Sequence, residues 1–143
     1  MQTFQSTSPE HTHDIAMDIA DDLQPGAIVT LTGDLGAGKT TFGKGFAEGL
    51  GVTSEISSPT FTLIDVHQYS HNGKACQFVH VDTYRGESAE DFVDIGLEEY
   101  LGAPDTICLI EWPEKILPLL QGKNVINITI TPTSETARDI TVA

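Results

Sequence analysis

The stretch GDLGAGKT, residues 33–40, decides the fold of this chain. It satisfies the pattern G-x-x-x-x-G-K-[ST] at every position, and that pattern is typical of loops whose backbone N–H groups wrap a phosphate. In such a loop the lysine, here Lys39, supplies a point charge for the β- and γ-phosphates, and the hydroxyl of the next residue, here Thr40, reaches Mg²⁺. We therefore predict that residues 33–40 bind the phosphates of a nucleotide.

The residues on either side of this stretch have the patterns of a buried strand and a helix. The run AIVTLT, residues 27–32, is short, apolar and partly β-branched, which favours a strand. Residues 39–50 favour a helix, whose N-terminal end would present the positive end of its dipole to the phosphate. Gly43, Gly45 and Gly49 each cost this helix up to about 1 kcal/mol relative to Ala. So many glycines indicate that the helix lies very close to a neighbouring element.

The rest of the chain alternates between helical and strand patterns. A helix is predicted over 8–23, with Thr7 and Glu10 at the spacing of a capping box. Downstream of the loop, the patterns predict two strands over 61–69 and 75–84, joined by a hairpin turn at Asn72-Gly73. Next come an acidic helix over 87–101, broken at Gly96, and a buried strand over 106–111. The last predicted elements are a short helical piece over 113–120, interrupted by Pro118, and an antiparallel hairpin over 124–142. These elements predict one α/β domain over residues 1–143 with a mixed, partly antiparallel central sheet.

Two carboxylates stand at the ends of predicted buried strands. Asp82 ends the run FVHVD and Glu111 ends the run ICLIE. A phosphate-binding loop works with an acidic residue in such a place, where it positions Mg²⁺ or water. Either residue could instead be a strand-end carboxylate that faces solvent. Because the chain has no NKxD signature for guanine, ATP is favoured over GTP as the nucleotide.

The charge of the chain narrows its class further. Seven Lys and Arg residues stand against 21 Asp and Glu residues, which gives a formal net charge of −14. That balance weighs against unaided binding to nucleic acid or to an anionic membrane, because both need clustered cations. The two cysteines match no metal or disulfide pattern, and no run reaches the roughly 20 apolar residues of a membrane helix. We expect a soluble, cytoplasmic protein.

Five motifs in sequence order make a more specific pattern: GDLGAGKTTF (33–42), SPTFTL (58–63), HVDTYR (80–85), DIGLEEYL (94–101) and IEWPEK (110–115). Together they resemble the bacterial ATPase family of tRNA threonylcarbamoyladenosine biosynthesis, TsaE. The resemblance covers about residues 7–143. It implies a three-layer P-loop NTPase fold that hydrolyses ATP with Mg²⁺. The implied partners are threonylcarbamoyl-transferase subunits of the TsaD and TsaB type, with tRNA reached only indirectly through that complex, and ATP hydrolysis would let the complex turn over repeatedly.

The resemblance also implies residue roles. The triphosphate would be wrapped by Asp34, Leu35, Gly36, Ala37, Gly38, Lys39, Thr40 and Thr41. Thr40 and Glu111 would coordinate Mg²⁺, and Asp82 would act behind them or orient water. Thr60 would sense the γ-phosphate, and Thr7, Ser8 and Arg138 would contact the adenine.

Trp112 would lie beside the nucleotide. Its alternative is ordinary core packing, with Pro113 restricting its backbone to an extended conformation.

Two other functions stay open on the residues alone. A small-molecule kinase of the P-loop type is one, and a nucleotide-gated binding module is the other. Phosphoryl transfer to an acceptor usually recruits several arginines. Here Arg85 and Arg138 are the only two, which weakens the kinase hypothesis without excluding it.

Overall fold

Seven strands form one mixed sheet in the order β1-β7-β6-β2-β5-β4-β3. The computed structural model describes residues 1–34, 36–53, 64–83 and 89–143. Over these residues the elements are β1 (Gln2–Ser6), α1 (Pro9–Asp21), β2 (Ile28–Thr32), α2 (Lys39–Leu50), β3 (Ile64–His71), β4 (Lys74–Asp82), α3 (Ala89–Asp94), the 3-10 turn η1 (Leu97–Glu99), β5 (Thr106–Glu111), the 3-10 turn η2 (Pro113–Ile116), α4 (Leu117–Leu120), β6 (Val125–Pro132) and β7 (Arg138–Val142).

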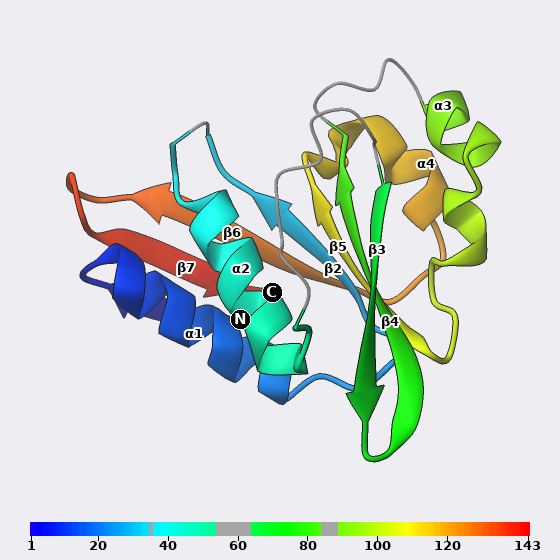
Figure 1. Cartoon of the computed structure of the whole chain (residues 1–143). Helices are drawn as coiled ribbons and strands as arrows, with labels where there is room; N and C mark the ends of the chain where they lie inside the picture. The colour runs from blue at the N-terminus through cyan, green and yellow to red at the C-terminus, as the bar shows by residue number, and fades with distance from the viewer. Residues whose placement is uncertain (35, 54–63, 84–88) are drawn as a thin grey trace.

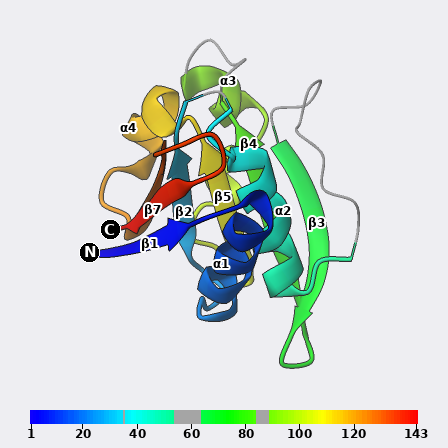
Figure 2. The same ribbon diagram turned by 90° about the vertical axis from the view of Figure 1, so that its left-hand side faces the viewer.

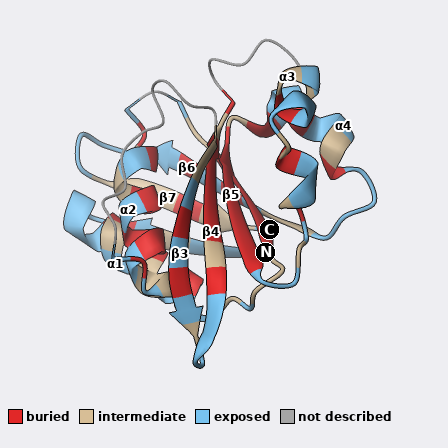
Figure 3. Ribbon diagram, turned by 45° about the vertical axis from the view of Figure 1, so that its right-hand side comes forward, coloured by how far each residue is buried: buried red, intermediate tan, exposed pale blue. Residues whose placement is uncertain are grey.

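The sheet separates two helical layers. Helices α1 and α2 cover one face, and α3, α4 and the 3-10 turns cover the other (Figure 1). Successive side chains of a strand point to opposite faces, so Val29 and Leu31 of β2 belong to the first core and Ile28 to the second. Strand β5 is buried along its whole length (Figure 3). The predicted three-layer α/β fold with a mixed sheet is confirmed.

The centre of the sheet is parallel and its edges are antiparallel. Strand β2 pairs in parallel with β5 and β6, and β4 pairs in parallel with β5. The predicted hairpins are confirmed: β3 pairs with β4 around Asn72 (φ 51°) and Gly73 (φ 80°), and β6 pairs with β7. The parallel strands β2, β4 and β5 therefore have their carboxyl ends on the same side of the sheet. In open α/β sheets, ligands bind in crevices outside these carboxyl ends.

Two details at the N-terminus differ from the sequence prediction. Strand β1 was not predicted, because Phe4 is its only large apolar side chain. The strand forms by pairing with β7, and Gln2 lies opposite Val142, so the two chain ends are close together (Figure 2). The predicted capping box of Thr7 and Glu10 is wrong. Ser8 caps α1, since its hydroxyl accepts a hydrogen bond from the backbone N–H of His11 at 3.0 Å, as expected when Pro9 takes the first helical position.

Helices α1 and α2 pack backbone to backbone through the glycines of α2. A methyl group on Gly45 would overlap the carbonyl oxygen of His13, and one on Gly49 would lie 2.5 Å from the carbonyl oxygen of Met17. The close approach predicted from the glycine content is confirmed. This contact fixes α2, and with it the loop that precedes α2, against the rest of the first layer.

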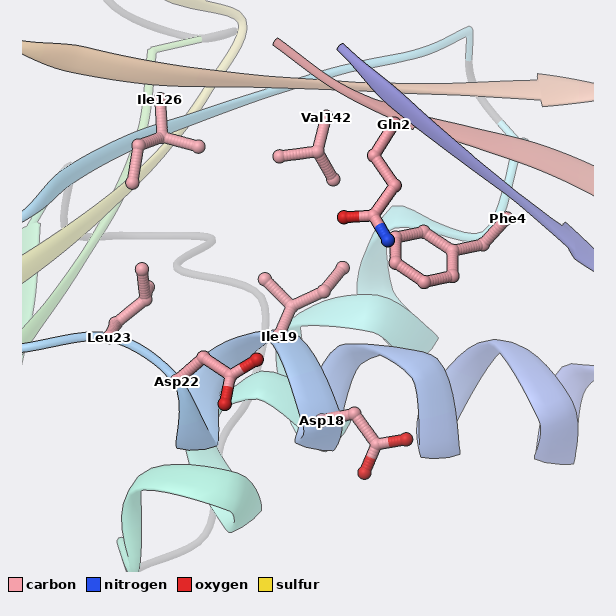
Figure 4. Close-up of a pocket in the computed structure, with 8 residues that line it drawn as sticks. All are labelled: Gln2, Phe4, Asp18, Ile19, Asp22, Leu23, Ile126 and Val142. Atoms are coloured by element: carbon pink, nitrogen blue, oxygen red, sulfur yellow. The ribbon is translucent and has the colours of Figure 1, made fainter.

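A separate pocket lies between α1 and the strands β1, β6 and β7 (Figure 4). It has a volume of about 310 Å³ and apolar walls that include Phe4, Ile19 and Leu23. Ile126, near the start of β6, also lines it, so the pocket lies at the end of the sheet opposite to loop 33–40.

Across the described part of the chain, we find no helix long and apolar enough to cross a membrane.

Candidate functional site: a phosphate-binding loop beside two carboxylates

The glycine-rich loop joins the end of β2 to the start of α2, as the sequence predicts. Gly36 (φ 81°) and Gly38 (φ 105°) both adopt the left-handed region that residues with a Cβ avoid. Gly38 is the N-cap of α2, and Phe42 closes the first helical turn by donating to its carbonyl oxygen at 2.9 Å. The loop therefore leads directly into a helix N-terminus, where backbone N–H groups and the helix dipole favour an anion.

Lys39 is the first residue of α2 and is buried. Its ammonium group donates to the carbonyl oxygen of Gly33 and lies 3.5 Å from that of Asp34. It also lies 3.7 Å from the centroid of the Trp112 ring. Burial lowers the pKa of Lys39, and the negative charges of Glu111, Asp82, Asp34 and Glu114 oppose that shift. A lysine at a helix N-terminus is placed to meet an anion such as a phosphate.

Asp82 and Glu111 are neighbours at the ends of two parallel strands. They are directly paired in the register of β4 and β5, and Leu31 of β2 is the opposite neighbour of Glu111. Asp82 is half-buried, whereas Glu111 is buried, and the Glu111 Oε2 atom lies 2.6 Å from Nε2 of His80. The structure therefore brings both predicted carboxylates to the strand ends beside the loop.

Trp112 departs from the conformation predicted for it. The proline that follows favours an extended backbone, yet Trp112 has φ 58° and ψ 60°, in the left-handed region. Such a conformation costs on the order of 1–3 kcal/mol in a residue other than glycine. The contact of its ring with Lys39 and a hydrogen bond from the Thr83 hydroxyl to its carbonyl oxygen hold it there. The prediction of an extended Trp112 is therefore wrong, and a position of its ring beside a bound nucleotide stays a prediction.

Arg138, the first residue of β7, connects the C-terminal hairpin to the loop. Its Nε donates to the carbonyl oxygen of Ala37 at 2.8 Å, and its Nη2 donates to that of Gly36 at 3.3 Å. Its Nη1 donates to carbonyl oxygens of its own hairpin, including that of Ser134 at 3.0 Å. The guanidinium group thus holds the loop backbone in place. Ser6 pairs with Arg138 in the sheet, so the predicted adenine contacts Thr7 and Ser8 directly follow a residue that is paired with Arg138.

The other predicted site residues are placed as follows. Thr40 and Thr41 lie in the first turn of α2, Thr40 exposed and Thr41 half-buried. Leu35 and Thr60 lie outside the described residues. Binding roles for all of these residues stay predictions.

Sequence reasoning missed two side chains next to the carboxylates. His80 was given no role, although it stands two residues before Asp82 and so shares its face of β4. Thr83 was given no role, yet its hydroxyl lies in hydrogen-bond contact with the carbonyl oxygens of both Glu111 and Trp112. Because alternate residues of a strand share a face, the spacing of His80 and Asp82 could have indicated that His80 lies next to the carboxylates. Nothing in the sequence indicated the second.

The donor set fits Mg²⁺ held together with a nucleotide. A hydroxyl on Thr40 and carboxylates on Glu111 and Asp82 are the oxygen ligands that this ion prefers. In the described part of the chain no group of three His, Cys, Asp or Glu side chains could hold a metal ion by itself. Mg²⁺ at nucleotide sites is typically bound through one or two carboxylates and completes its shell with phosphate oxygens and water, and Glu111 and Asp82 offer those carboxylates.

The loop, the helix that follows it and the strand-end carboxylates define the class of protein: a three-layer P-loop NTPase fold. Comparison with known proteins gives the family. The family model described as threonylcarbamoyl adenosine biosynthesis protein TsaE matches residues 6–140. The chain therefore belongs to the TsaE family.

Individual relatives agree with this assignment. The tRNA threonylcarbamoyladenosine biosynthesis protein TsaE of Bacillus subtilis is 41% identical over 138 residues, which cover 96% of this chain and 82% of that protein. The protein of the same name from Treponema pallidum is 42% identical over 121 residues, covering 85% and 84%. The crystal structure of YdiB from Bacillus subtilis superposes with a TM-score of 0.73 at 36% identity, covering 99% of this chain and 83% of that one.

Proposed function

We propose that this chain is a Mg²⁺-dependent ATPase that supports tRNA threonylcarbamoyladenosine modification. One observation carries the proposal: the ammonium group of Lys39 lies at a helix N-terminus inside a glycine-rich loop, with Glu111 and Asp82 close enough to act on its charge. Phosphoryl transfer needs little covalent chemistry from the protein, and it depends on positioning and on charge stabilisation. This arrangement offers both.

The residues divide the work as follows. The loop N–H groups and Lys39 hold the β- and γ-phosphates, and the ammonium exchanges its carbonyl partners for charged phosphate oxygens, which make stronger hydrogen bonds. Thr40 and Glu111 would hold Mg²⁺, which would neutralise charge on the phosphates. Asp82 or Glu111 orients the water that attacks the γ-phosphate. Thr7, Ser8 and Arg138 would contact the adenine.

The chain would act within a larger assembly. Relatives that carry the TsaE name are biosynthesis proteins of this modification, and we propose transferase subunits of the TsaD and TsaB type as its partners. A net charge of −14 disfavours direct contact with tRNA, so the RNA would be reached through those partners in the cytoplasm. Residues 1–143 would form one ATPase domain that hydrolyses ATP to reset the complex.

Turnover of Mg-ATP, measured with and without the transferase subunits, tests this role. We expect phosphate release that requires Mg²⁺ and rises when the subunits are added, and repeated rounds of tRNA modification only when the chain is present. Partner-independent hydrolysis, together with repeated modification in the absence of the chain, would rule the role out. Transfer of the γ-phosphate to a small acceptor in place of water would indicate a kinase.

The fluorescence of Trp112 is expected to change when ATP binds. The ring lies 3.7 Å from the Lys39 ammonium, and phosphate binding draws that cation away from the ring face. Because the chain has a single tryptophan, the emission reports this one side chain. Titration with ATP should give a saturable shift, and Lys44→Ala, which removes an exposed lysine of α2, should behave like the wild type. If calorimetry detects ATP binding but the emission does not change, Trp112 is a packing residue that does not report on the nucleotide.

A further inference from the structure

A buried contact joins Glu111 to a histidine that the proposed chemistry does not use. The Nε2 atom of His80 lies 2.6 Å from Oε2 of Glu111, and the two residues are only 3% and 5% exposed. A buried carboxylate needs donors to replace the water it has lost. Among the described hydrogen bonds, His80 is the side chain that supplies one to Glu111.

The other ring nitrogen of His80 fixes the position of the ring proton. Its Nδ1 atom is buried and has no hydrogen-bond partner among the described residues. An N–H group there would be a buried donor without an acceptor, which costs about 1–3 kcal/mol. Since an unused lone pair is tolerated better than an orphaned N–H, the proton belongs on Nε2. The short contact is therefore a hydrogen bond that His80 donates to the Glu111 carboxylate.

The surroundings hold the imidazole in this orientation. Its ring stacks on Phe78 of the same strand, with centroids 6.2 Å apart and planes inclined by 15°. On the α2 side it faces Gly43, where a methyl group would lie 4.0 Å from the ring Cε1. His80 is thus enclosed between its own strand and the helix that begins with Lys39, and its donor cannot turn away without repacking both.

We infer that His80 is a positioning residue that orients Glu111 for Mg²⁺ and for the attacking water. With Oε2 accepting the His80 proton, Oε1 keeps both of its acceptor positions for the metal ion or the water. The hydrogen bond also keeps the carboxylate from turning onto the neighbouring Lys39, whose ammonium is needed for phosphate. This inference rests on the proposed ATPase function and adds to it a residue that touches neither nucleotide nor metal.

Two matched substitutions test the inference. The side chain of His80→Gln places an N–H donor about where Nε2 lies, whereas the shorter His80→Asn cannot reach Glu111. Removing such a supporting partner typically costs about 10- to 100-fold in metal affinity or activity. For His80→Asn we expect the Mg²⁺ concentration for half-maximal ATP turnover to rise by about that factor. Calorimetric affinity for ATP in EDTA should stay near the wild-type value, and His80→Gln should recover most of the Mg²⁺ dependence.

Several outcomes decide between positioning and packing. Unchanged Mg²⁺ dependence in His80→Asn, or equal losses in His80→Gln and His80→Asn, would overturn the inference. Thermal melting checks that each variant is folded, and if His80→Asn is not, His80→Met repeats the measurement with an apolar side chain that has no donor. Mg²⁺-dependent enhancement of ATP binding provides a readout that needs no hydrolysis. A wild-type protein without Mg-ATP turnover would overturn the proposed function, whereas normal wild-type turnover with an unaffected His80→Asn would overturn this inference alone.

Discussion

Lys39→Ala is expected to lower the affinity for ATP by roughly 10- to 100-fold, because hydrogen bonds to charged groups contribute about 1.5–3 kcal/mol each. The loss follows from position as well as charge. Lys39 is buried at the start of α2, its ammonium lies within the loop, and acidic side chains stand around it. Without the cation, a triphosphate would meet Glu111 and Asp82 with no neutralising side chain between them. The substitution should therefore weaken binding of ATP more than binding of adenosine.

A matched control separates this local role from net charge. Lys44→Ala removes one positive charge from the same helix, but Lys44 is exposed. Isothermal titration calorimetry with ATP should give the wild-type affinity for Lys44→Ala and a sharply reduced affinity for Lys39→Ala. Equal affinities for the two variants would contradict the assignment of residues 33–40 as the phosphate-binding loop.

The loop and the strand ends could be predicted because their signals are local. Residues 33–40 must combine glycines at positive φ, a lysine and a hydroxyl within eight positions, and few other structures demand that combination. Buried strands leave continuous apolar runs, so the runs that end at Asp82 and Glu111 were visible without coordinates. Once the strands are parallel, their ends meet at one edge, and the two carboxylates become neighbours.

The contacts that hold the site together could not be predicted, because they join distant segments. Arg138 reaches the loop only because β7 pairs with β6, and β6 lies beside β2. Thr83 fixes Trp112 through the pairing of β4 with β5. The left-handed backbone of Trp112 runs against the local preference of a residue before proline. All three depend on tertiary contacts, which local sequence patterns do not show.

The packing of α1 on α2 leads to the largest expected effect on stability. Gly45→Ala adds a methyl group that would overlap the carbonyl oxygen of His13 and lie 3.0 Å from its carbonyl carbon. Backbone atoms cannot move aside as the end of a flexible side chain can, so the two helices must separate. Overpacking of this kind costs typically about 1–3 kcal/mol, and backbone contact places Gly45→Ala at the upper end. A loss of that size in a chain of this length lowers the melting temperature by roughly 10 °C.

Gly43→Ala is the matched control in the same helix and is expected to have the opposite sign. A methyl group there would lie 4.0 Å from the nearest atoms of His80 and Leu109, which is open enough to accept it. Without a clash, the higher helix propensity of alanine should stabilise α2 by up to about 1 kcal/mol. Urea unfolding followed by circular dichroism would give both free energies. Equal stability of the two variants would show that α1 does not lie against the backbone of α2. A loss in Gly45→Ala alone would mean that helix propensity is sacrificed at this position so that the helix carrying Lys39 can sit directly on its neighbour.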